Sequence, residues 1–219
     1  LCVSRFQLLF SVLLAVITYI EAEGRMYRIY ATGALLAVIP VYILLTVASS
    51  HDTAYLNAVF EMKNAGLPIF VTQPYMYVAN NYDNFDCLVK GLAGHSWGLK
   101  MLAPLWTFTG LKFLFPSLTA FPVYVTKEEL TTLTIFYDAY YDFGIPGVLG
   151  FSCLLGMAAY LLMRLMRQAK NPVWYLLYAQ FAVCMLLSFF TTWFSNPSTW
   201  FYLAVTAAAA FSVSRRWGA

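Results

Sequence analysis

The sequence predicts an all-α polytopic membrane protein with about five transmembrane helices and a large outer loop that is partly membrane-associated. Three observations lead to this prediction. Of the 219 residues, 61% are hydrophobic and only 11% are charged, whereas soluble domains usually carry about 25% charged residues. Apolar runs that are long enough to cross a bilayer as helices recur along the chain. Basic residues gather in the short links between these runs, as the positive-inside rule requires.

The apolar runs divide the chain into three regions. Residues 1–48 hold two candidate spans joined by a cytoplasmic turn, residues 49–140 form the large outer loop, and residues 141–219 hold three more candidate spans. Each run approaches the roughly 20 apolar residues that cross a bilayer as a helix. The five runs cover about residues 6–20, 29–47, 141–163, 173–194 and 199–213.

The basic residues indicate which side of the membrane each link occupies. With five crossings, the two short basic links and the C-terminal tail all fall on one side, and they hold seven of the 13 basic residues. We therefore expect the N-terminus outside and the C-terminus in the cytoplasm. The seven residues are Arg25, Arg28, Arg164, Arg167, Lys170, Arg215 and Arg216.

The large loop contains one further apolar run, Met101–Pro116. A crossing here would put the later links on the wrong side by charge, and the run contains Pro104, Gly110 and Lys112. We expect a re-entrant or surface-lying segment, because non-spanning backbone at membrane depth needs protein or a water-filled cavity around it.

A helix is predicted to lead from the loop into the third span. Thr126 followed three residues later by Glu129 is a capping box, so we expect the helix to begin there. Asp138 and Asp142 are four residues apart and share one face if the helix continues through them. We expect Gly144, Gly147 and Gly150 to permit close helix approach.

The first candidate site is Asp138, Tyr141 and Asp142 at the mouth of the third span. A carboxylate close to the hydrocarbon edge is costly unless it is paired, and such residues often have a function. Burial and a nearby like charge would raise the pKa of a carboxyl group, which suits a general base. The alternative is that both aspartates are solvated and favoured by the helix dipole.

The second candidate site is a polar and aromatic stretch of the outer loop. Amides and carboxylates can hydrogen-bond sugar hydroxyls, and aromatic faces can stack on sugar rings. Turn formation is the alternative interpretation. No arginine lies in residues 49–140, so lysine or histidine would have to offset a phosphate there. The candidate substrate-binding residues are Asn80, Tyr82, Asp83, Asn84, Asp86, Lys90 and His95.

Motifs for other chemistries are absent from the sequence. It has no P-loop, GxGxxG, HExxH or GxSxG, and no metal-ligand spacing. We therefore expect no nucleotide cofactor, no metal and no nucleic-acid partner.

Several motifs resemble those of the bacterial oligosaccharide repeat-unit polymerases, the Wzy-type O-antigen and capsule polymerases. YDAYYDFGIPGVLGFSCLLG is similar to the aromatic run that opens a late membrane helix in that family. VANNYDNFDCL, followed by GLKMLAPLWTF, resembles a feature of its large outer loop. EGRMYR is a weaker version of its Gly-Ser-Arg cytoplasmic turn, with Glu23 in place of Ser.

The resemblance implies a multi-pass enzyme of the bacterial inner membrane whose C-terminal half is this chain, an expectation that fits the missing initial methionine. The large loop would be periplasmic. The reaction would transfer a glycan from undecaprenyl pyrophosphate to another lipid-linked repeat unit, with Asp142 or Asp138 as the base and Lys90 or His95 as the cation for the leaving pyrophosphate. A flippase and a chain-length regulator would be partners.

Three other functions remain possible from the sequence. An O-antigen ligase would be expected to carry arginine and histidine in its large outer loop, which here lacks arginine. A transporter or flippase would have charged residues deep inside its spans, and the candidate spans here are almost free of charge at their centres. A structural membrane subunit would leave the polar and aromatic loop unexplained.

Overall fold

The computed structural model describes residues 5–23, 28–48, 53–59, 61–64, 66–128, 130–168 and 171–216. The fold is 75% helical and contains no strand in these ranges. The prediction of an all-α protein is therefore confirmed.

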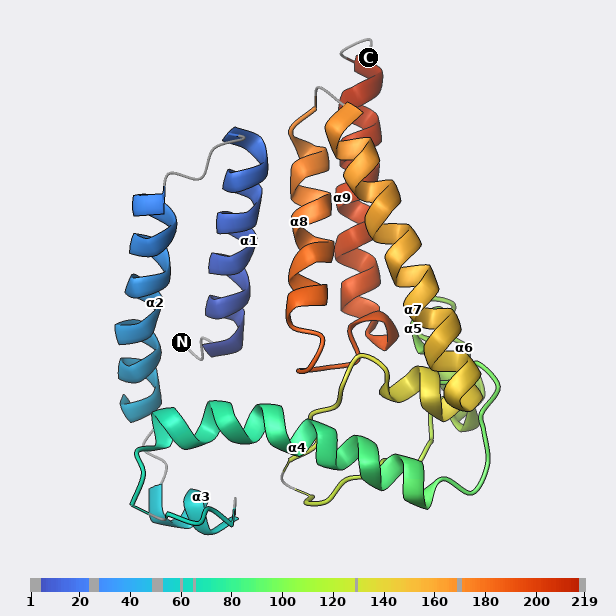
Figure 1. Ribbon diagram of the computed structural model, residues 1–219. Coiled ribbons are helices and arrows are strands. Elements are labelled where there is room, and N and C mark those ends of the chain that lie inside the picture. The colour runs from blue at the N-terminus through green and yellow to red at the C-terminus, as the bar shows by residue number, and fades with distance from the viewer. Residues whose placement is uncertain are drawn as a thin grey trace. The chain divides into compact units, whose positions relative to one another are not determined.

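The chain divides into two compact units, Leu1–Ala79 and Asn80–Ala219. In the first unit, α1 (Arg5–Glu23) and α2 (Arg28–Ala48) pack against each other and run in opposite directions (Figure 1). They coincide with the first two predicted spans. The short helix α3 (Thr53–Val59) follows, and α4 (Ile69–Gly91) continues into the second unit.

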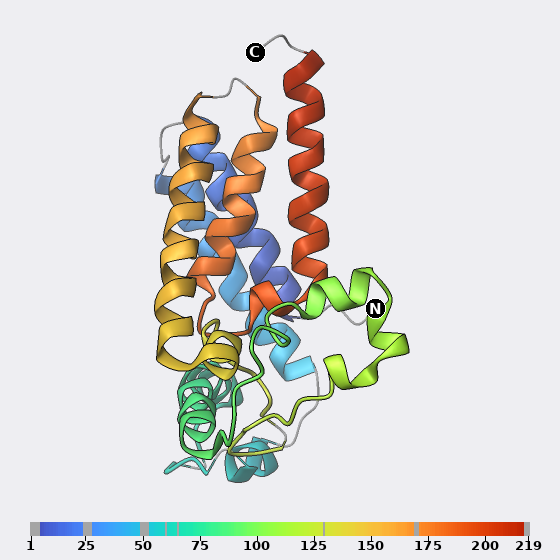
Figure 2. The same ribbon diagram turned by 90° about the vertical axis from the view of Figure 1, so that its right-hand side faces the viewer.

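The second unit is built around three helices that stand side by side and alternate in direction (Figures 1 and 2). They are α7 (Tyr137–Gln168), α8 (Val173–Leu186) and α9 (Pro197–Arg216). Helix α8 packs against both α7 and α9. Met166, Trp174, Leu177 and Ala210 form a buried cluster among them.

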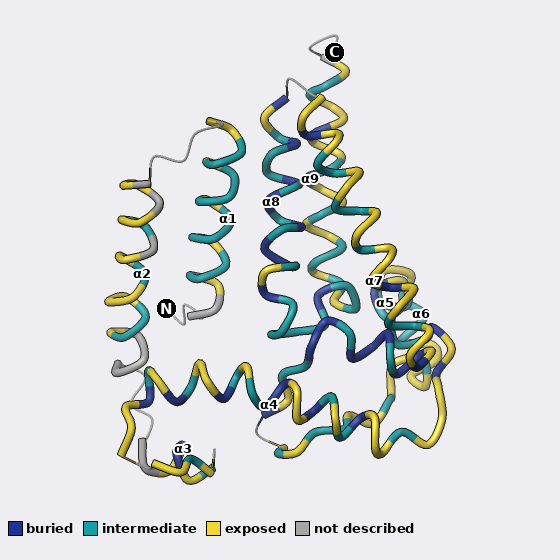
Figure 3. Tube along the Cα trace, in the orientation of Figure 1, coloured by how far each residue is buried: buried dark blue, intermediate teal, exposed yellow. Residues whose placement is uncertain are grey.

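One helix of the described chain, α7, is long and apolar enough to cross a membrane. Much of its surface is exposed along the length of the helix (Figure 3). The other four predicted spans also lie on helices, but none of these combines the necessary length and hydropathy over its described residues. The structure thus shows one candidate crossing, and the five-span arrangement stays a prediction.

Helix α7 contains a sharp break at Gly144. Its φ of 65° and ψ of −147° lie in a region of backbone conformation that essentially only glycine adopts. Beyond the break, a Cβ added at Gly147 would collide with the carbonyl oxygen of Ala139 and lie 2.7 Å from Cβ of Phe143. These two glycines let the first turns of α7 fold closely against the rest of the helix. Gly150 has nothing within 4 Å of an added Cβ, so the expectation that it aids a close approach is wrong.

The helix predicted to begin at Thr126 does not form. Residues 126–128 and 130–134 are non-helical, and α7 begins only at Tyr137. The hydroxyl of Thr126 donates instead to the side-chain carbonyl oxygens of Asn80 (2.9 Å) and Asn84 (3.0 Å). The Thr126 hydroxyl, which would have capped a local helix, therefore bonds to side chains of α4. Glu129, the other member of the capping box, lies outside the described residues.

The apolar run Met101–Pro116 folds as an arm of two short helices and does not form a span. Helix α5 (Ala103–Phe108) and helix α6 (Leu111–Leu114) are separated by a turn at Gly110, whose φ is 74°. A 3-10 turn, η1 (Pro116–Leu118), ends the arm. Helix α5 packs against α9, and the arm extends sideways from the base of that helix (Figure 2). The expectation of a non-spanning segment agrees with this geometry.

Candidate functional site

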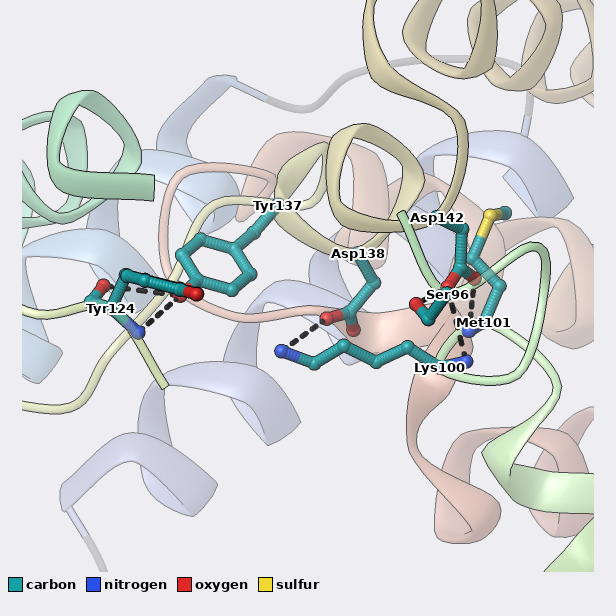
Figure 4. A network of polar contacts seen from close by, with 7 residues as sticks. All are labelled: Ser96, Lys100, Met101, Tyr124, Tyr137, Asp138 and Asp142. Carbon is teal, nitrogen blue, oxygen red and sulfur yellow. Dashed lines mark hydrogen bonds and ion pairs between the residues drawn. The ribbon is translucent and has the colours of Figure 1, made fainter. Parts of the chain in front are cut away.

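The candidate site lies at the end of the second unit where α7 begins and α8 leads into α9. The backbone N–H of Ile135 donates to the carbonyl oxygen of Ser188 (2.7 Å), which ties the segment before α7 to the end of α8. The 3-10 turn η2 (Trp193–Ser195) lies in the same α8–α9 connection. Figure 4 shows the polar network that forms here.

Asp142 holds the loop before α5 against the start of α7. Its side chain is fully buried. Its carboxylate accepts hydrogen bonds from the hydroxyl of Ser96 and from the backbone N–H groups of Lys100 (3.2 Å) and Met101 (2.8 Å) (Figure 4). Such a carboxylate is well compensated in its charged form. Asp142 thus fixes the position of the loop that carries Lys100.

Asp138 forms a buried ion pair with Lys100. Oδ1 of Asp138 lies 3.4 Å from Nζ of Lys100, and Asp138 is only 3% exposed. Among the described residues, neither of these two atoms has a hydrogen-bond partner. The hydroxyls of Thr192 and Ser195, from the α8–α9 connection, interact with the same carboxyl group. The pair is therefore enclosed and incompletely satisfied, which is unusual for a purely structural contact.

Aromatic rings complete the surroundings of Lys100. Its Nζ lies 4.2 Å from the ring centroid of Tyr141 and 4.6 Å from that of Tyr137. Burial lowers the pKa of the Lys100 ammonium below its ordinary value, although the carboxylate of Asp138 opposes this shift. One residue thus contacts both aspartates, Asp142 through its backbone and Asp138 through its side chain (Figure 4).

His95 lies beside the break in α7. Its Nδ1 is 3.2 Å from the carbonyl oxygen of Tyr141, and its ring covers Gly144 closely enough to meet an added Cβ at 3.1 Å. The neighbouring Trp97 is exposed, and its backbone N–H donates to the carbonyl oxygen of Asp142 (3.2 Å). The structure therefore brings His95 next to the candidate catalytic residues on α7.

Asn80 and Asn84 are buried and bind backbone. The Asn80 amide donates to the carbonyl oxygen of Leu130 (3.0 Å), and the Asn84 amide donates to those of Leu130 (2.8 Å) and Thr132 (2.9 Å). Their carbonyl oxygens accept from Thr126. In this arrangement the two asparagines hold an irregular segment in place.

The remaining candidate binding residues lie on the exposed side of α4. Tyr82, Asp83, Asp86 and Lys90 are all exposed. Lys90 and Asp86 form an ion pair one helical turn apart (2.6 Å), and their hydrogen bond raises the pKa of Lys90. The opposite side of α4 packs through Leu88 against the start of α7.

The structure thus joins some of the sequence candidates and separates others. Asp138, Tyr141, Asp142 and His95 come together, whereas the candidates on α4 either bind backbone or face outwards. Lys100 is the central residue that the sequence-based candidates left out, because scattered lysines are usually solvated. Its place as the one cation in GLKMLAPLWTF was an available signal. Nothing in the sequence identified Ser96, Thr192 or Ser195.

Comparisons of the chain with protein-family models, with curated proteins and with solved structures found no match. Within the described ranges, no three His, Cys, Asp or Glu side chains converge to hold a metal ion. The fold and site together define an all-helical protein with one candidate membrane span. Asp138 in the first turn of that helix forms a buried pair with Lys100 from the loop before α5.

Proposed function

We propose that this chain is part of a multi-pass enzyme of the Wzy type, which joins lipid-linked oligosaccharide repeat units at the periplasmic face of the bacterial inner membrane. The observation that carries the proposal is the buried Lys100–Asp138 pair at the start of the candidate span. The YDAYYDFGIPG motif, which resembles that family, contains Asp138. Five crossings and a periplasmic large loop belong to this proposal.

The proposed reaction is glycosyl transfer with a diphosphate leaving group. The acceptor hydroxyl oxygen forms a bond to the anomeric carbon of the donor glycan while the bond from that carbon to the diphosphate breaks. Asp138 takes the proton of the hydroxyl, and Lys100 offsets the charge that develops on the diphosphate. Undecaprenyl pyrophosphate leaves, and no nucleotide sugar takes part.

The environment of the pair suits these two roles. A cation and a base work best when they are already in position and screened from water. Asp142 fixes the loop that carries Lys100, and Tyr137 and Tyr141 flank the ammonium. Of the two aspartates, Asp138 is the better candidate base, because Asp142 already accepts three hydrogen bonds.

The glycan would extend towards the exposed polar groups. Tyr82, Asp83 and Asp86 on α4 offer a ring face and carboxylates to solvent. His95 is exposed beside the start of α7. A flippase that delivers the repeat units and a chain-length regulator are the partners that this reaction needs.

The test is complementation with the intact gene in a host that lacks its own surface-polysaccharide polymerase. The length ladder of the surface glycan on a gel is the readout. We expect wild type to restore long chains, and Asp138→Asn and Lys100→Met to leave single repeats when expression is adjusted so that the membranes contain equal amounts of each protein. Glu128→Gln, which changes an exposed carboxylate outside the proposed site, is the matched control and should give the wild-type ladder.

Three outcomes would overturn the proposal. A full ladder from both Asp138→Asn and Lys100→Met would mean that the pair has no part in the chemistry. If the strain without the gene instead accumulates lipid-linked units on the cytoplasmic side, transport is the function. If it makes normal chains that are not attached to their final acceptor, a ligase is indicated.

A further inference from the structure

The arm formed by α5, α6 and η1 exposes an unusual amount of apolar surface. Phe113 and Leu114 are 77% and 72% exposed, and Phe108 and Phe115 are also largely exposed. Contiguous apolar patches of this kind mark interaction sites, since water solvates them poorly. None of these side chains takes part in the polar network around Asp138 and Asp142.

The arm carries one positive charge and no negative charge. Lys112 is the single charged residue between Met101 and Thr126. Its Nζ lies 5.0 Å from the ring centroid of Phe113, so the ammonium sits at the edge of the exposed aromatic surface. An apolar face bordered by one cation and no acid matches a layer of acyl chains beneath anionic phosphates.

The position of the arm indicates the same partner. Helix α5 packs against α9, and the arm projects from the base of that helix, where α9 begins (Figure 2). Phe201 and Tyr202 are exposed in the early turns of α9. The arm therefore packs against the helix that carries these exposed aromatic residues, and aromatic residues gather at membrane–water interfaces.

We propose that the α5–α6 arm lies in the interface between lipid and water on the outer face of the membrane that the chain occupies. Phe113, Leu114 and Phe115 would insert among the bilayer lipids, and Lys112 would lie at the headgroup phosphates. The break at Gly110 folds the two helices into a wedge too short to cross the bilayer. Insertion would anchor the loop that carries Lys100 at the level of lipid headgroups. This inference rests on the membrane topology of the proposed function, but it does not depend on the proposed reaction.

The experiment is site-specific photocrosslinking of the full chain in native membranes. A photoreactive phenylalanine analogue replaces Phe113 in one variant and Tyr82 in another. Tyr82 is the matched control, since it is an aromatic residue 60% exposed on α4. Mass spectrometry measures lipid adducts, and a gel detects protein adducts. We expect the lipid-adduct yield at position 113 to exceed that at position 82 several-fold.

The charge of Lys112 provides a second measurement. With the crosslinker at position 113, Lys112→Gln should lower the share of anionic lipids among the adducts about fivefold, the ratio expected for one basic group at an anionic surface. An unchanged share would overturn the role of Lys112. Equal lipid yields at positions 113 and 82, or mainly protein adducts at position 113, would overturn insertion in favour of solvent or of a protein partner.

Discussion

Gly147→Ala should destabilise the protein although alanine is the better helix former. The added methyl would collide with the carbonyl oxygen of Ala139 and lie 2.7 Å from Cβ of Phe143. Overpacking costs about 1–3 kcal/mol, and a backbone carbonyl cannot rotate away, so the upper end applies. The change from glycine to alanine within a helix returns about 1 kcal/mol. A net loss of about 2 kcal/mol corresponds to a Tm about 4–8 °C lower for a chain of this size.

Gly150→Ala is the matched control, because no described atom lies within 4 Å of its added methyl. It should raise Tm by about 2–4 °C through helix propensity alone. The assay is thermal unfolding of the detergent-solubilised protein, followed by size-exclusion chromatography after heating. If Gly147→Ala is as stable as Gly150→Ala, the first turns of α7 do not fold back against the helix as described.

Two further changes test the contacts around the site in the same assay. Lys100→Met leaves the Asp138 carboxylate buried without its cation and should cost about 3–5 kcal/mol, whereas adding Asp138→Leu should restore most of the loss; equal losses in the single and double variants would contradict a buried pair. Asn84→Ala leaves the carbonyl of Thr132 unpaired and should cost about 1–3 kcal/mol. Asp83→Ala, at the neighbouring exposed position, should change stability by less than about 0.5 kcal/mol. Similar losses from Asn84→Ala and Asp83→Ala would contradict the role of Asn84 in holding the segment before α7.

Local patterns predicted the helices well but said less about membrane crossing. Apolar composition and length placed helices at the regions of α1, α2, α7, α8 and α9. Membrane crossing needs a long apolar run that is also one continuous helix, and α8 ends at Leu186 in a turn before its run is complete. Where a helix stops depends on contacts from elsewhere, such as the hydrogen bond from Ile135 to Ser188.

The same reason explains the wrong start of the helix before α7. The capping box at Thr126 is a local signal, and its hydroxyl has more than one possible acceptor. Asn80 and Asn84 lie more than 40 residues earlier in the chain, and on α4 they face the same way because they are four residues apart. They bind the backbone of residues 126–132 at both ends. Sequence proximity therefore overstated the local helix and overlooked a tertiary clamp.

The arrangement of Lys100 answers why two aspartates stand at the start of α7. Asp142 accepts hydrogen bonds from the backbone of the loop, and these bonds fix the position of the Lys100 backbone, from which its side chain extends. The side chain then reaches Asp138, one turn earlier on the same helix face. A lysine on a free loop would lose much of its attraction to one carboxylate in side-chain and backbone entropy. Asp142 lowers that cost because it holds the backbone of the loop in place. The two carboxylates therefore have different roles: Asp142 positions the cation, and Asp138 pairs with it.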